Sequence, residues 1–249
     1  MKKDEIQKVQ DDEYDFPYHH IPTYKKIFTQ CINWSWGINY VATIEFIIDK
    51  IKQEDFNSLV DIGCGDGRLT KELREEFKNQ EVEGIDYSEK AICLAKAMDF
   101  HGNYHCVDIL SNQLKKKYDI ALLIEVFEHI PVETSDAFLS AVARLINKDG
   151  LLILTVPHLN LPVEPKHYRH FSVETLSICL GKYFDIVEII PFEKNDKRKV
   201  IIDFLLANNI FILNHWRLRN LIYKIYKKTL FFVEEEDFCK RIYIKAKAK

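Results

Sequence analysis

The residues of this chain that are best suited to binding a ligand lie in a glycine-rich turn between a strand and a helix. In residues 59–67, an apolar run leads into Gly63, Gly65 and Gly67, and a helix is expected to follow. Glycine permits a sharp turn and a close approach of the backbone to a ligand, and the first amide groups of the helix point into the same crevice. The spacing G-x-G-x-G differs from the G-x-G-x-x-G of dinucleotide sites, and no Walker lysine follows. The turn therefore predicts a ligand site outside those two classes.

Carboxylates stand at the ends of the first three expected strands. Asp61 lies two residues before the first glycine, where it would repel a pyrophosphate and favour a cationic group. Asp86 can accept hydrogen bonds from both hydroxyls of a ribose, and Tyr87 can lie against a base. Asp108 can accept from the exocyclic amine of adenine, with Ile109 packed on the ring. Each carboxylate alone is explained as a loop residue or helix cap, but the ordered set at the carboxyl ends of strands favours a cationic nucleoside.

On these motifs the chain resembles the class I methyltransferases that depend on S-adenosylmethionine (AdoMet). DIGCGDGRLT is similar to their glycine-rich motif, GIDYSEKAI to the acidic motif of the second strand, and VDIL to the adenine-binding motif. IEVFEHI and LINKDGLLILTVP resemble their fourth and fifth strands. The resemblance spans about residues 38–190 and implies AdoMet as the cofactor. The residues that it assigns to the cofactor are Asp61, Gly63, Cys64, Gly65, Gly67, Asp86, Tyr87, Asp108, Ile109 and Glu125.

The alternation of expected strands and helices predicts an α/β fold with a doubly wound, mostly parallel sheet. The resemblance implies seven strands, the last of them antiparallel. Residues 118–124 and 150–156 are nearly all apolar, as in strands that are buried on both faces, whereas residues 240–247 predict a final strand on the sheet edge. The other strands are expected at 58–62, 81–85, 104–107 and 184–190, and helices at 38–51, 69–77, 89–100, 132–146 and 172–180.

Two parts are expected along the chain. Residues 1–37 predict a polar tail and an N-terminal helical cap rich in aromatic residues, which either covers a pocket or packs on the sheet as ordinary core. Residues 38–249 form the methyltransferase domain. A helical, aromatic and basic insertion at about 195–235 precedes the last strand, and in the related enzymes insertions at this place often shape the acceptor site.

A second cluster of chemically capable residues follows the fourth expected strand. Glu125, Glu128 and His129 are spaced so that they share one face if the stretch is helical, and with His170 they would form an oxygen and nitrogen set for Mg²⁺ or Mn²⁺. The pattern resembles the ubiquinone-biosynthesis O-methyltransferases and the small-RNA 2′-O-methyltransferases, in which such residues hold a metal. Metal-free relatives share parts of it, with Glu125 beside the cofactor and His170 in a hydrogen bond, and this metal-free interpretation is favoured.

Histidines near the same expected pocket are candidates for acid–base chemistry, because an imidazole titrates near neutral pH. His129 and His170 lead as catalytic residues for the acceptor, and His158 and His167 are further general-base candidates. A single histidine is more often structural, but several near one pocket favour a role for at least one.

Residues 215–228 predict a basic amphipathic helix. Leu218, Leu221, Ile222 and Ile225 recur at i, i+3, i+4 and i+7, and the basic residues fall largely elsewhere. Such a helix can make peripheral contact with an anionic membrane or with RNA phosphates. A solvated face over a core-packed apolar stripe is the interpretation favoured here.

Composition sets the remaining limits. The net charge of −3 in 249 residues gives no overall attraction to nucleic acid or membrane. The six cysteines include no C-x-x-C pair, which argues against a zinc knuckle and for reduced thiols in a cytoplasmic protein. No signal-peptide core and no apolar run near the ~20 residues of a membrane span is present.

The expected function is methyl transfer from AdoMet to an oxygen, with nitrogen as the alternative, of a small-molecule, saccharide or prenyl-type acceptor. A metal-assisted RNA 2′-O-methyltransferase is a second hypothesis, against which the acidic balance counts. A non-catalytic AdoMet-binding partner subunit is a third. The sequence leaves the oligomeric state open.

Overall fold

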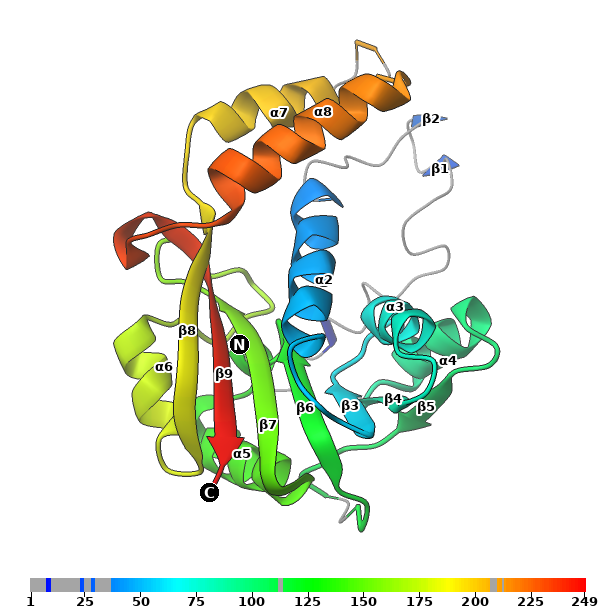
Figure 1. Ribbon diagram of the computed structural model, residues 1–249, viewed down its shortest axis with the longest axis vertical. Helices are drawn as coiled ribbons and strands as arrows, with labels where there is room; N and C mark the ends of the chain where they lie inside the picture. The colour runs from blue at the N-terminus through cyan, green and yellow to red at the C-terminus, as the bar shows by residue number, and fades with distance from the viewer. Residues whose placement is uncertain are drawn as a thin grey trace.

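The computed structural model contains one seven-stranded sheet with the strand order β5-β4-β3-β6-β7-β9-β8 (Figure 1). The structure describes residues 8–9, 23–24, 28–29, 37–111, 114–206, 210–211 and 213–249. The strands of the sheet are β3 (Ser58–Ile62), β4 (Glu81–Asp86), β5 (Asn103–Cys106), β6 (Tyr118–Ile124), β7 (Ile146–Pro157), β8 (Phe184–Lys194) and β9 (Cys239–Ala248). The helices are α2 (Gly37–Ile51), α3 (Arg68–Glu76), α4 (Glu89–Met98), α5 (Ser135–Arg144), α6 (Val173–Leu180), α7 (Arg198–Leu206) and α8 (Trp216–Tyr226).

The pairing pattern confirms the predicted mixed sheet. β3 pairs in parallel with β4 and β6, β4 with β5, and β6 with β7. β9 is antiparallel to both of its neighbours. The carboxyl ends of the parallel strands therefore meet along one edge, where the predicted ligand-binding residues follow them.

The predicted position of the last strand at the sheet edge is wrong. β9 lies between β7 and β8, and the edge position belongs to β8. The successive residues Ile242, Tyr243 and Ile244 are all fully buried, as required of a strand that is covered on both faces. Pro191 is accommodated within β8 because an edge strand pairs on one side alone.

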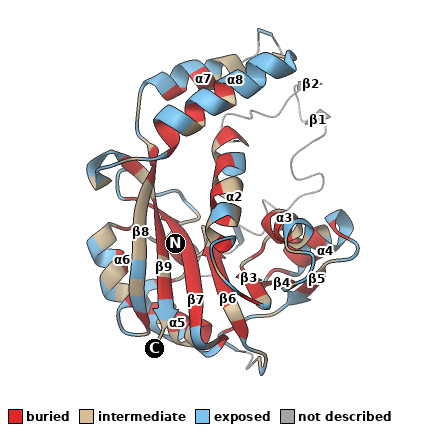
Figure 2. Cartoon of the chain, viewed as in Figure 1, coloured by how far each residue is buried: buried red, intermediate tan, exposed pale blue. Residues whose placement is uncertain are grey.

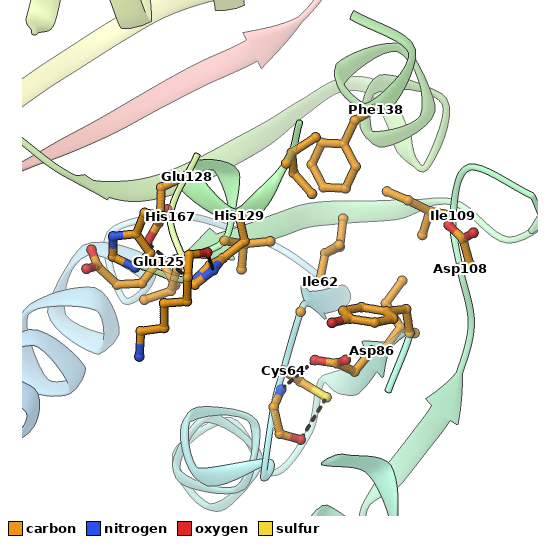
Figure 3. A pocket seen from close by; sticks show the side chains of 18 of the residues that line it. Ile62, Cys64, Asp86, Asp108, Ile109, Glu125, Glu128, His129, Phe138 and His167 are labelled. Atoms are coloured by element: carbon orange, nitrogen blue, oxygen red, sulfur yellow. Dashed lines mark hydrogen bonds and ion pairs between the residues drawn. The ribbon is translucent and has the colours of Figure 1, made fainter. Parts of the chain in front are cut away.

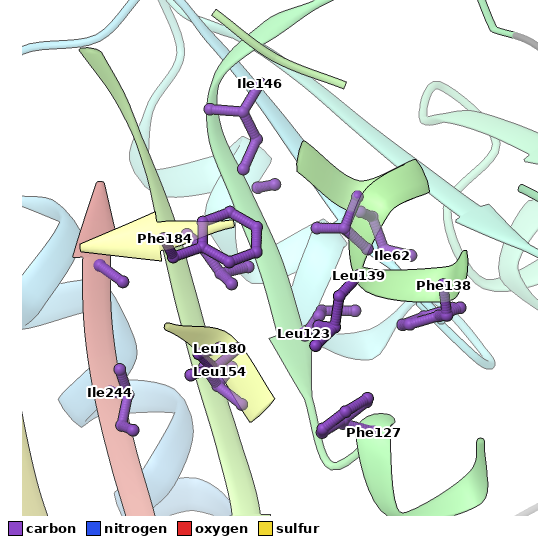
Figure 4. Packing of buried hydrophobic residues seen from close by; sticks show 14 of the residues in the cluster. Ile62, Leu123, Phe127, Phe138, Leu139, Ile146, Leu154, Leu180, Phe184 and Ile244 are labelled. Atoms are coloured by element: carbon purple, nitrogen blue, oxygen red, sulfur yellow. The ribbon is translucent and has the colours of Figure 1, made fainter. Parts of the chain in front are cut away.

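Apolar side chains from helices cover both faces of the sheet, which makes the fold doubly wound. On one face, α5 and α6 pack against β6, β7 and β9 around residues such as Leu139, Leu154 and Leu180 (Figure 4). On the other face, α2 and α3 pack against the same central strands, and Ile222 and Tyr226 of α8 join this second core. The central strands are accordingly buried along most of their length (Figure 2).

The segment predicted as a helical insertion contains α7 and α8, which lie beyond the carboxyl end of β8 (Figure 1). A π-helical turn, η3 (Lys227–Phe231), leads from α8 back to the sheet. The cap predicted over residues 1–37 falls almost wholly outside the described residues. Within that range the structure describes a short antiparallel pair of strands, β1 (Thr23–Tyr24) and β2 (Phe28–Thr29). Among the described helices, none combines the length and apolarity needed to cross a membrane.

Candidate functional site

A cavity of about 730 Å³ opens at the carboxyl ends of β3, β4, β5 and β6 (Figure 3). One end is lined by the glycine turn and the residues that follow β4 and β5. The other end is lined by the residues that follow β6, by a loop before α6, and by Arg241 of β9. Phe138, Ile130 and Pro131 add apolar surface to the cavity lining.

The glycine turn has the backbone conformation that its residues predict. Gly63, Gly65 and Gly67 have φ of 75°, 56° and 76°, in the left-handed region that side chains disfavour. A Cβ on Gly63 would lie 2.6 Å from the side chain of Val126, the second residue after the end of β6. The amides of Gly63 and Cys64 both donate to the carbonyl of Ile85, which fixes the turn against β4.

Asp86 ties the end of β4 to the glycine turn. Its Oδ2 accepts a hydrogen bond from the amide of Gly65 at 3.0 Å, and its Oδ1 accepts from the amide of Ser88 at 2.9 Å. Ser88 in turn caps α4 by accepting from the amide of Ala91. The carboxylate of Asp86 thus stabilises the wall of the cavity that it lines. Its contact with a ribose stays a prediction.

Asp61 lies beneath the glycine turn and is not among the residues that line the cavity. Its side chain is 3% exposed and accepts a hydrogen bond from the hydroxyl of Thr70 at 2.7 Å. Burial, together with the nearby charge of Asp86, raises the pKa of Asp61 to about 7. Any influence of Asp61 on a cationic ligand is therefore exerted through the turn, by charge.

The remaining residues assigned to the cofactor lie at the cavity surface, except Gly67, which is the N-cap residue of α3 and does not line the cavity. Cys64, Tyr87, Asp108 and Ile109 all line it, and Figure 3 shows Asp108 and Ile109 at the end opposite the histidines. Asp108 also stabilises its own loop, because its Oδ1 accepts from the amide of Leu110 at 2.9 Å. Burial raises the pKa of the Cys64 thiol, which keeps it neutral.

The stretch after β6 does not form the α-helix that would place its acidic residues on one face. Glu125 has a φ of 56°, and the next turn is the short 3-10 helix η1 (Phe127–His129). Oε1 of Glu125 accepts from the hydroxyl of Thr155, and its Oε2 accepts from Nε of Arg241, each at 2.9 Å. Glu125 is therefore held by Thr155 of β7 and Arg241 of β9, and its carboxylate is not among the candidate ligand atoms that group with Glu128.

Arg241 is a cavity residue that sequence reasoning missed. Besides Glu125, its guanidinium is paired with Glu193, which is buried, has a φ of 58° and also accepts from Asn39. Although burial disfavours its charge, these carboxylates raise the pKa of Arg241. The signal in the sequence was an arginine within the last strand, and it becomes informative only once that strand is known to be central.

Glu128 and His129 place a buried carboxylate beside an imidazole. Glu128 is fully buried, and neither of its carboxylate oxygens has a hydrogen-bond partner among the described residues. Oε1 of Glu128 lies 3.9 Å from Nε2 of His129. Nδ1 of His129 donates to the carbonyl of Lys166 at 3.0 Å, so the neutral ring carries its lone pair on Nε2. Burial, and then the charge of Glu125, raise the pKa of Glu128.

The structure exchanges the predicted roles of two histidines. His170 is 5% exposed and does not line the cavity, because its Nδ1 donates to the carbonyl of Leu161 at 3.0 Å and its Nε2 lies 2.8 Å from Nδ1 of His167. His167 must then donate to His170, which leaves its lone pair on Nε2 at the cavity wall. Of these two histidines, His167 lines the cavity and His170 does not.

His158 is also removed from the list of general-base candidates. It is buried outside the cavity, where its Nδ1 accepts from the amide of Asn160 and its Nε2 donates to Glu236 at 2.9 Å. Both nitrogens thus serve to hold the loop after β7 against the segment before β9.

The side chains present fit a metal ion, but with a different ligand set from the predicted one. Ligand atoms of Glu128, His129 and His167 all lie within 4.8 Å of one another. Two imidazole nitrogens and one carboxylate suit Zn²⁺, Mn²⁺ or Fe²⁺ better than Mg²⁺, which prefers oxygen ligands. The buried and unpartnered carboxylate of Glu128 is the observation that supports this fit.

A family model described as a methyltransferase domain matches residues 39–189 of this chain. (S)-coclaurine N-methyltransferase from Thalictrum flavum subsp. glaucum is 26% identical over 134 residues, which cover 52% of this chain and 36% of that enzyme. Ubiquinone biosynthesis O-methyltransferase from Nitrosomonas europaea is 27% identical over 139 residues, which cover 53% of each protein. The matched part thus spans about half or less of the length of these curated relatives.

Solved structures show the same fold. The crystal structure of the N-methyltransferase NodS from Bradyrhizobium japonicum WM9, in complex with S-adenosyl-L-homocysteine, superposes with a TM-score of 0.56. It covers 84% of this chain and 86% of that one at 13% identity. At this identity the likeness concerns the arrangement of strands and helices.

Proposed function

Because this chain belongs to the methyltransferase domain family, we propose that it transfers the methyl group of AdoMet to an oxygen atom of a small-molecule acceptor. The observation that carries the proposal is the cavity that joins the glycine turn to the paired imidazoles of His129 and His167. The first end is built for a nucleoside, and the second can receive a proton from a hydroxyl group.

At the cofactor end, the chain supplies a preformed shape and negative charge. AdoMet, when bound, supplies a methyl group that its sulfonium already activates. The open backbone of Gly65 and the carboxylates of Asp86 and Asp108 surround the space for the nucleoside. The negative charge of Asp61 beneath the turn favours a cation above it. The chain therefore has to align the acceptor and exclude water more than it has to form bonds.

At the acceptor end, we assign proton acceptance to Nε2 of His129. His167 is the poorer base, because burial and the neighbouring His129 and His170 lower its pKa to about 3. The carboxylate of Glu128, 3.9 Å from His129, would stabilise the imidazolium that forms. A hydroxyl must lose its proton during methylation, whereas a neutral amine can react first, so this arrangement favours oxygen over nitrogen as the target atom.

A second arrangement is favoured by the unpartnered carboxylate of Glu128. In it, Glu128, His129 and His167 hold a divalent transition metal, which would supply a Lewis acid for an acceptor oxygen. His129 would then be a ligand and not a base, so the two arrangements are mutually exclusive. The RNA 2′-O-methyltransferase hypothesis also requires a bound metal. In addition, it requires an RNA-binding surface.

The experiment measures formation of S-adenosyl-homocysteine from AdoMet with a panel of phenol, catechol, saccharide and prenylated acceptors. It compares the wild-type protein with His129→Asn and with His105→Asn, a control at an exposed position of β5. Removal of a general base is expected to lower kcat by about 10²–10⁴-fold, and to leave AdoMet affinity unchanged. The same assays after chelation, and after return of Mn²⁺ or Zn²⁺, separate the two arrangements.

The outcomes are distinct. Activity that survives chelation and falls in His129→Asn supports the base. Activity that is lost on chelation and restored by metal supports the metal arrangement. Tight AdoMet binding without turnover of any acceptor would support a non-catalytic subunit, and the absence of AdoMet binding would contradict the proposal as a whole.

A further inference from the structure

Helix α8 carries an apolar stripe that the fold leaves exposed. Leu218, Leu221 and Ile225 recur at i, i+3 and i+7 and so share one face of the helix. Their exposed fractions are 42%, 52% and 48%, whereas the core takes up Ile222 and Tyr226. The favoured sequence interpretation, a stripe packed in the core, is therefore wrong for these three residues.

A basic stripe runs beside the exposed apolar one. Arg217 and Lys224 lie at i and i+7 of α8, on the side of the helix away from the core, and Lys228 follows in η3; all three are exposed. Trp216, 61% exposed at the start of α8, lies next to them, with the guanidinium of Arg217 5.3 Å from its ring centroid. Residues 215–228 contain no acidic residue, although the chain as a whole has a net charge of −3.

The acidic residues that the structure describes around this helix do not neutralise this surface. Asp203 of α7 is paired with Lys199 at 2.6 Å. Glu45 of α2 accepts from Lys227 and Tyr223, on the core side of α8. The acidic run at 234–237 lies beyond η3, past the carboxyl end of the helix (Figure 1). In the part of the chain that the structure describes, none of these carboxylates is paired with Arg217, Lys224 or Lys228, so the basic stripe can face an anionic partner.

We propose that the face formed by Leu218, Leu221, Ile225, Arg217 and Lys224 of α8, together with Lys228 of η3, docks on an anionic membrane surface. An apolar stripe flanked by lysine and arginine, with a tryptophan at one end, matches the chemistry of a helix that lies in the lipid interface. RNA phosphates would engage the basic side chains but would leave the apolar stripe in water, so they match the surface less well.

The position of α8 relates this surface to the cavity. α7 and α8 follow the carboxyl end of β8, which runs parallel to β7 because both are antiparallel to β9. The cavity opens at the carboxyl ends of the parallel strands, so both features lie at the same end of the sheet (Figure 1). When the protein is docked, its cavity would lie near the lipid, where an amphiphilic acceptor could enter it. This consequence rests on the proposed function, whereas the docking itself does not.

Sedimentation of the full-length protein with vesicles tests the docking without any measure of activity. The probes are vesicles of phosphatidylcholine alone and of phosphatidylcholine containing phosphatidylglycerol, at low and high salt. The wild-type protein is expected to bind the anionic vesicles and to be released by salt. The variants R217Q/K224Q/K228Q and L218S/L221S/I225S are each expected to weaken binding by about tenfold or more.

The matched controls carry the same changes elsewhere. K115Q/K117Q/K148Q removes three exposed charges at the amino-terminal side of β6 and β7, and Ile178→Ser removes an apolar side chain that is 72% exposed on α6. Both controls should bind as the wild type does, and all variants should melt at similar temperatures because the substituted side chains are exposed. Equal binding to neutral and anionic vesicles, equal loss in the controls, RNA binding that depends on the basic stripe alone, or dimerisation through the same face would each overturn the proposal.

Discussion

Nε of Arg241 lies 2.9 Å from Oε2 of Glu125, so the central last strand is tied directly to the turn that follows β6. Both residues line the cavity, and both carboxylates that pair with Arg241 belong to residues with positive φ. Non-glycine residues adopt that conformation at a cost of about 1–3 kcal/mol each, so the surrounding contacts must hold them there. The ion pair is one of the contacts that keep the acceptor end of the cavity in shape.

Arg241→Met is expected to lower the free energy of unfolding by about 2–4 kcal/mol, because it removes the ion pair of Glu125 and leaves the buried carboxylate of Glu193 with the longer contact to Lys240, at 4.0 Å, as its remaining ion pair among the described residues. Denaturant unfolding of the variant and the wild type measures the change. Arg198→Gln is the control, since Arg198 is exposed and screening by water leaves a surface ion pair little net effect on stability. A loss at position 241 no larger than the loss at position 198 would contradict the structural role of Arg241.

Gly63→Ala should destabilise the protein by about 1–3 kcal/mol through its φ of 75° alone, and further through the clash of its Cβ with Val126. It should also weaken AdoMet binding, because the glycine turn has to move. Thermal unfolding and calorimetric titration measure the two effects. Gly181→Ala, at a helical φ of −59°, should change stability by no more than about 1 kcal/mol and leave binding intact. If both variants behave alike, the turn is less constrained than its conformation indicates.

The affinity for AdoMet should depend on pH through Asp61. Burial raises the pKa of Asp61 to about 7, so the carboxyl is protonated below that pH, and binding of a cation then requires release of the proton. Affinity is therefore expected to fall as pH decreases below 7, approaching about tenfold per pH unit. Stability of the free protein has the opposite sign: the raised pKa stabilises the fold below the unfolded pKa of about 3.9, and this contribution is lost as pH rises through about 7.

Calorimetric titration of AdoMet across this pH range, in the wild type and in Asp61→Asn, checks the prediction. The amide introduced by this substitution can still accept from Thr70 but cannot titrate, so the difference between the two profiles isolates Asp61 from the titration of AdoMet itself. Parallel profiles would show that the charge of Asp61 does not act on the cofactor.

Divalent metal binding should appear as a rise in melting temperature. A ligand that binds the folded state alone, at one hundred times its Kd, adds about 2.7 kcal/mol of stability. If the metal arrangement holds, Zn²⁺ or Mn²⁺ raises the melting temperature of the wild type and of the control His105→Ala, but not that of Glu128→Gln or His167→Ala. An equal rise in all four proteins would show that the metal binds at some other site. No rise in any of them would contradict the metal arrangement and favour His129 as a general base.

The sequence by itself determined the parts of this protein that depend on neighbouring residues. Gly63, Gly65 and Gly67 predict a turn with positive φ, because local sterics favour glycine in that conformation. Apolar runs predict buried strands, because both faces of such strands lie in the core. Asp86 and Asp108 could be placed at one cavity from the same patterns, since the carboxyl ends of parallel strands always meet at one edge of the sheet. The family resemblance added the antiparallel last strand, which the pairing of β9 confirms.

Only the tertiary structure decided which side chains face each other across long separations in the chain. Arg241 and Glu125 are 116 residues apart, and nothing local to either predicts their pairing. The choice of His167 over His170 depends on which ring nitrogen meets the carbonyl of Leu161. The exposure of Leu221 depends on where α8 crosses the core. Packing and hydrogen bonding between distant segments fix each of these, so a pattern read along the chain leaves them open.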